Sequence, residues 1–355
     1  MSDQFQPRAL PMLIGSQPLR EHDEATRLVL QYTPQIPNWV QLPVYRHEGM
    51  VEQFMAGLPG LARKGESNCV DVAGGEFDEQ MLAFFEEYLQ VTSQETEWEQ
   101  SRFVLSAREA PGFFSLMNAL QSGSGDLKAV KGQITGPVTF CTALQDQDQR
   151  AIFYHDGLRD AAVKLLALKA GWQVRALRRF GVPVIIFIDE PALAGYGSSE
   201  FISISRQDIN NCLQEVMDTV HGQNAMAGVH VCANTDWSLL LESEVDIVNF
   251  DAHGYFDKLI LYSDQLGRFL ASGRFLAWGL VPTLQPEQIE AASVDTLWRD
   301  WTAKVNQLAD KGIDPEMVKA QAFITPACGT GSLTPELSRK VVELTRGLSD
   351  RIRRD

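Results

Sequence analysis

The sequence has no long apolar run, no excess of positive charge and few cysteines, and each absence excludes a class of protein. No stretch reaches the ~18 apolar residues of a membrane-spanning helix, and the N-terminus lacks the apolar segment of a signal peptide. Net charge is −15, which repels nucleic-acid phosphates and anionic membrane surfaces. Five cysteines, odd in number and scattered, suit a reducing compartment better than a disulfide framework. These features predict a cytoplasmic protein that binds neither nucleic acid nor membrane.

The chain also lacks a linker that would divide it, and its 355 residues with 45% hydrophobic content can bury a sizeable core. Short apolar or β-branched runs alternate with helical patterns along its whole length. The predicted strands are 10–15, 68–73, 129–134, 183–188, 225–231, 245–250, 274–280 and 321–324, and the clearest predicted helices are 158–180, 207–221, 285–311 and 334–353. Eight strand–helix repeats predict an α/β protein with a single (β/α)₈ TIM barrel. A doubly wound sheet is the alternative.

Ligand-type residues follow most of the predicted strands, at the ends that converge on one face of such a barrel. The clearest case is His230 and Cys232, which alternate along a strand and therefore face the same side. Cys328 ends the eighth run and Asp251 the sixth, so one imidazole, two thiolates and a carboxylate form a candidate Zn²⁺ site. His253 is a rival for the fourth ligand. A buried structural pair is the alternative for His230 and Cys232.

Carboxylates provide a second group of candidates. Asp189 and Glu190 follow a strongly apolar strand and are the candidate catalytic carboxylates, although Asp189 can also be a helix N-cap. Glu76 follows two glycines, and together these acids can hold an ammonium group. The remaining thiols have no such neighbours and are expected in the core; they are Cys69, Cys141 and Cys212.

Several of these motifs, taken in order, resemble a known family. The segments are ITGPVT at 134–139, IDEPAL at 188–193, the His230-x-Cys232 pair and Pro326-x-Cys328-Gly329. They look like the catalytic C-terminal domain of cobalamin-independent methionine synthase. That domain belongs to a superfamily with uroporphyrinogen decarboxylase and the zinc methyltransferases that act on corrinoid-bound methyl groups. The resemblance covers about 10–334, nearly the whole chain.

The resemblance implies one TIM-barrel domain over 1–355, with its core at about 10–334, and a Zn²⁺ that binds the homocysteine sulfur. It makes His230, Cys232 and Cys328 ligands, and Asp251 stands roughly where the family has glutamate. The substrate contacts of the family fall on three further residues. These are Ser16 for the substrate carboxylate, and Glu76 and Asp189 for its ammonium.

Two departures from the family bear on the methyl donor. Full-length synthases carry an extra N-terminal barrel that helps to bind polyglutamyl folate, and a tryptophan after the GPVT segment that packs on it. This chain is expected to have neither. Residues 140–144, which follow the GPVT segment, read FCTAL and contain no tryptophan. The expected donor is therefore a methyl-corrinoid, delivered by a corrinoid protein, and the expected acceptor is a small thiol, homocysteine first. The alternatives are a metal-independent decarboxylase of the uroporphyrinogen type, or a non-catalytic barrel that binds corrinoid or a thiol.

Overall fold

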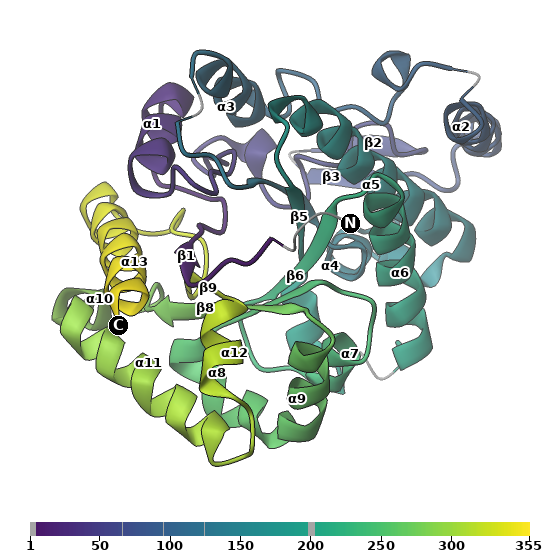
Figure 1. The fold of residues 1–355 in the computed structure, drawn as a ribbon. Helices are drawn as coiled ribbons and strands as arrows, with labels where there is room; N and C mark the ends of the chain where they lie inside the picture. Colours follow the sequence, from purple (N-terminus) through teal and green to yellow (C-terminus); the bar gives the residue numbers. More distant parts are fainter. Residues whose placement is uncertain (1–4, 66, 95, 124, 198–202) are drawn as a thin grey trace.

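The computed structural model describes residues 5–65, 67–94, 96–123, 125–197 and 203–355. Its centre is a curled sheet of seven parallel strands, with helices packed around it (Figure 1). The strands lie in the order β1-β9-β8-β7-β6-β5-β4, which runs in chain order without the reversal of a doubly wound sheet. Their bounds are β1 Leu10–Pro11, β4 Val130–Thr135, β5 Val184–Asp189, β6 Met226–Val231, β7 Ile247–Phe250, β8 Phe275–Val281 and β9 Ala322–Pro326.

The four predicted helices are all present, and the longest predicted pattern is divided in two. It breaks into α10 and α11 because the Ser293 side chain accepts from the backbone N–H of Thr296 and starts a new helix. The helices are α1 His22–Tyr32, α2 Phe77–Thr92, α3 Pro111–Gln121, α4 Pro137–Ala143, α5 Asp156–Leu177, α6 Arg206–Gly222, α7 Ser238–Leu241, α8 Ala252–Leu259, α9 Ser263–Ala271, α10 Pro286–Ala291, α11 Val294–Ala309, α12 Pro315–Ala320 and α13 Pro335–Arg354. Among the described residues, no helix has both the length and the apolar composition that crossing a membrane requires.

The second predicted strand forms in part, but it does not join the central sheet. Ser67–Val70 forms β3, which pairs antiparallel with β2, Leu61–Lys64, in a separate two-stranded sheet. The place between β1 and β4 is taken by residues 38–41, which make only isolated parallel bridges, Asn38 to Lys131 and Gln41 to Ser16. Prolines at 37 and 43 flank this segment, and a proline cannot donate to a ladder. The sheet is therefore TIM-like and curled, but it is not a closed eight-stranded barrel.

We call the junction of residues 37–41 with β1 and β4 the seam. Isolated backbone hydrogen bonds, such as that from Lys131 N–H to the Pro37 carbonyl at 2.9 Å, are supplemented there by side chains. The Nζ of Lys131 donates to the Ile14 carbonyl at 2.5 Å, and the Nε2 of Gln133 donates to the Trp39 carbonyl at 3.0 Å. Gln173 of α5 accepts from the Trp39 indole and donates to the Gln133 carbonyl, both at 2.9 Å. Burial of Lys131 lowers its pKa to about 8.

Every second residue along the strands points into the interior of the curled sheet. An apolar cluster that includes Leu10, Ile185, Phe187, Ile247 and Phe323 packs inside the sheet. Because strand side chains alternate, the next inward residue of β5 after Phe187 is Asp189. The strands thus run from an apolar interior to polar side chains at their carboxyl ends, where a site can form.

Candidate metal centre

His230, Cys232 and Cys328 come together at the carboxyl ends of β6 and β9. His230 lies in β6, Cys232 directly follows it, and Cys328 follows β9 by two residues. One ligand atom from each residue lies within 4.8 Å of the others. The structure therefore brings together three of the four predicted ligands.

The protonation of the three groups suits a metal. His230 is 3% exposed; its Nδ1 lies 2.5 Å from Asn249 Oδ1, and its buried Nε2 has no hydrogen-bond partner among the described residues. The adjacent Cys328 thiol and then His230 lower the pKa of Cys232 to about 4, and the Cys232 thiolate raises the pKa of Cys328. A free imidazole nitrogen beside two sulfurs is a donor set that zinc prefers. The residues present fit that metal.

A cavity of about 260 Å³ opens over this group. It is lined by the three ligand candidates and by Ser16, Asp189, Thr135 and the 41–50 segment, including Met50. Thr135 donates from its hydroxyl to the Met50 carbonyl and so ties that segment to β4. The volume suits a small molecule.

Ser16 and Asp189 both reach this cavity, as predicted from the strand ends. Ser16 lies so close to Gly329 that a Cβ there would be 2.1 Å from the Ser16 hydroxyl oxygen, so a larger residue would displace that hydroxyl from its present position. Asp189 is 7% exposed, and its Oδ1 has no hydrogen-bond partner among the described residues. Burial raises the pKa of Asp189, and a cation in the cavity would relieve that cost.

Glu190 and Glu76 do not join the site. Glu190 follows Asp189 on the strand and therefore points to the opposite side. Its carboxylate accepts from the backbone N–H groups of Val138 and Thr139, both at 2.8 Å, and so caps α4. Burial raises the pKa of Glu190 to about 7. Glu76 follows the outlying strand β3, is exposed at the start of α2, and does not line the cavity.

Asp251 and His253 also lie outside the three-residue group. Asp251 is buried, and its Oδ1 accepts from the Gly254 N–H at 2.8 Å as the N-cap of α8. Both residues line a second cavity beside the first. Neither residue belongs to the three-residue group, and the choice between them as the fourth ligand stays a prediction.

Sequence reasoning missed Asn249 and the 41–50 segment. Asn249 carried a signal, because it is a polar residue in the apolar strand β7, two residues before Asp251 and on the same side. The 41–50 segment gave no such signal in the sequence, because it does not follow a recognisable strand and is placed by its contacts with Ser16 and with Thr135 of β4.

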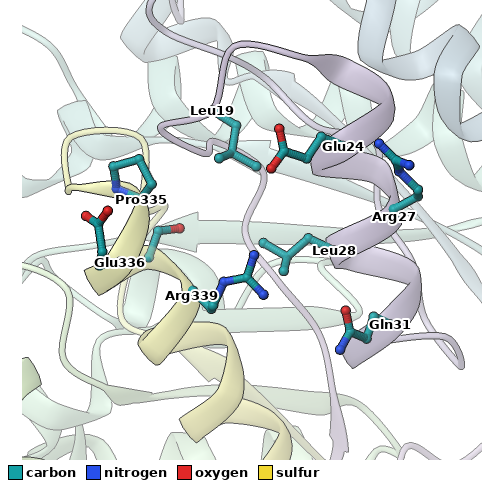
Figure 2. Close-up of a pocket in the computed structure, with 9 residues that line it drawn as sticks. Leu19, Glu24, Arg27, Leu28, Gln31, Pro335, Glu336 and Arg339 are labelled. Carbon is teal, nitrogen blue, oxygen red and sulfur yellow. The ribbon is translucent and has the colours of Figure 1, made fainter.

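A larger cavity, about 440 Å³, lies away from the metal centre between α1 and α13 (Figure 2). Its lining includes Glu24 and Arg27 of α1 and Glu336 and Arg339 of α13. Both signs of charge are present and the cavity shares no lining residue with the site, so it does not bear on the chemistry.

Comparison with known proteins identifies the family of the chain. The family described as cobalamin-independent synthase, catalytic domain, matches residues 65–348. Among solved structures the chain is similar to a methyltransferase from Methanosarcina mazei, with a TM-score of 0.50 and 14% identity over 92% of this chain and 84% of that one. At that identity the likeness concerns the fold alone. No curated protein sequence matches the chain.

Proposed function

The chain belongs to the family of the cobalamin-independent synthase catalytic domain, which implies a methyltransferase in methionine synthesis, and we propose that it transfers methyl groups to a small thiol with the help of zinc. Homocysteine is the first candidate for the acceptor. The observation that carries the proposal is the convergence of His230, Cys232 and Cys328, with an unpartnered imidazole nitrogen, beneath a cavity that also holds Asp189.

These three residues would hold the Zn²⁺. When bound, the ion would keep a substrate thiol deprotonated at neutral pH, and the thiolate is the nucleophile in methyl transfer. The imidazole and the two sulfurs come from the ends of two strands in one hydrogen-bonded sheet, so their mutual distances are set by the fold.

Asp189 would bind the ammonium group of the acceptor, because its free carboxylate oxygen is buried in the cavity wall. The Ser16 hydroxyl, on the facing wall, would donate to the acceptor carboxylate. Glu190 supports the site from behind by holding the N-terminus of α4 against β5. The two ends of an amino acid would thus be fixed while its side chain reaches the sulfur ligands.

The proposed donor is a methyl-corrinoid rather than a folate. Among the described residues that line the cavity there is no Phe, Tyr or Trp on which a pterin ring could stack. Phe140, in the segment where the family has its tryptophan, is fully buried. A polyglutamate tail would also approach a chain of net charge −15.

The experiment compares methylcobalamin with methyltetrahydrofolate as donors, each with homocysteine and with mercaptobutyrate, which lacks the amino group. We expect transfer from methylcobalamin to homocysteine, and weaker binding of mercaptobutyrate. Preference for the folate would refute the donor assignment. Full zinc occupancy without transfer from either donor would favour a binding protein. A tetrapyrrole decarboxylase is disfavoured because no Arg or Lys appears among the described residues lining the cavity.

A further inference from the structure

Asn249 lies beside the metal centre without touching the cavity. It is fully buried in β7, and the strand register places it opposite His230 of β6. Its Oδ1 is 2.5 Å from His230 Nδ1. Its Nδ2 donates to the Ala277 carbonyl at 2.8 Å and to the Thr325 hydroxyl oxygen at 3.1 Å.

These contacts determine the proton on the imidazole. The Ala277 carbonyl can only accept, so the amide NH₂ of Asn249 must face it and the amide oxygen must face His230. The amide oxygen can only accept as well, so Nδ1 of His230 must carry a hydrogen. In a neutral imidazole the other nitrogen then has a free lone pair. That nitrogen is Nε2, the atom without a partner.

We propose that Asn249 is a positioning residue of the metal centre, which fixes the ring and tautomer of His230 so that Nε2 is presented to the metal. The inference rests on the proposed metal site. Ligating histidines generally donate their second N–H to an acceptor, often a carboxylate. Here Asp189 and a thiolate already lie close by, and a neutral amide fixes the ring without adding a further buried negative charge.

The first experiment uses the unmodified chain, loaded with an NMR-active cadmium isotope and labelled with nitrogen-15 histidine. We expect cadmium coupling at Nε2 of His230 and a retained hydrogen on Nδ1. Coupling at Nδ1, or cadmium binding without any coupling to His230, would overturn the proposal.

The second experiment compares Asn249→Leu with Thr325→Val. Leucine is close in size to asparagine but cannot accept from Nδ1, so we expect ~10–100-fold weaker Co²⁺ binding in chelator competition and an altered Co²⁺ absorption spectrum. The threonine variant keeps Asn249 and its bond to His230, so its affinity should stay near that of the parent chain.

Parental affinity in folded Asn249→Leu, or an equal loss in Thr325→Val, would refute the role of the histidine contact. If Asn249→Leu fails to fold, the cadmium spectrum of the unmodified chain decides the question. Both measurements read metal binding alone, so the failure of methyl transfer and the failure of this inference are distinguishable.

Discussion

The carboxyl group of Glu190 should make the stability of this protein depend on pH, and Glu190→Gln should remove that dependence. The side chain is fully buried, and burial raises its pKa from 4.5 to about 7 in the folded chain. Between these values the folded chain binds a proton that the unfolded chain releases, so the free energy of unfolding falls as pH rises. At ~1.4 kcal/mol for each pH unit, the loss is about 3 kcal/mol.

The assay is urea unfolding of both proteins across this pH range, at one metal concentration. The stability of the parent chain relative to Glu190→Gln should fall by about 3 kcal/mol from about pH 4.5 to about pH 7.5. Glu336→Gln, at an exposed position, measures the effect of removing one surface negative charge. A difference between parent and Glu190→Gln that stays constant with pH would refute the reasoning. If Glu190→Gln instead lost zinc while its stability stayed unchanged, Glu190 would have to be counted as part of the metal centre.

Three further predictions concern the site itself. Replacing Cys232 and Cys328 together by serine should abolish zinc binding and activity while the circular dichroism of the folded chain persists, and full zinc occupancy in this variant would refute the ligand assignment. Asp189→Asn should raise KM for homocysteine more than for mercaptobutyrate, because only the first carries an ammonium group; an equal change would place the ammonium elsewhere. Asp251→Ala should weaken zinc binding in chelator competition, and a loss in His253→Ala alone would identify the other residue as the fourth ligand.

Much of the sheet was predictable because several of its strands contain runs of apolar residues bounded by turn residues. The stretch that became β5 is an example, since residues 184–188 are all apolar and rich in β-branched side chains, as in a strand buried on both faces. The second strand was not predictable in this way. Residues 38–41 are partly polar and lie between prolines, whereas 68–73 looks like a strand but pairs with its own neighbour instead of the sheet. Glu76, which followed that run, was therefore misplaced with it.

The site shows the same division between strand residues and loop residues. His230 and Cys232 were predictable because alternation along β6 puts both on one side, and the same rule places Glu190 opposite Asp189. Asp251 was harder to place. It follows β7 directly, which is the position expected of a metal ligand, but in the structure its carboxylate caps α8. A local hydrogen bond three residues away competes with a long-range one, and the sequence does not state which prevails.

The seam gives the two walls of the cavity different mechanical characters. The strands that carry the sulfur and imidazole ligands, β6 and β9, are joined through β7 and β8 by backbone ladders, which almost any side chain can sustain. The wall at 41–50 continues from residues 37–41, which are held by a few isolated backbone hydrogen bonds and by the side chains of Gln133 and Gln173. The spacing between the ligand residues on β6 and β9 is therefore held by backbone hydrogen bonds, and most side-chain substitutions in β7 and β8 would leave it unchanged. The other wall depends in part on particular side chains, so substitution of Gln133 or Gln173 would remove hydrogen bonds that hold it in place.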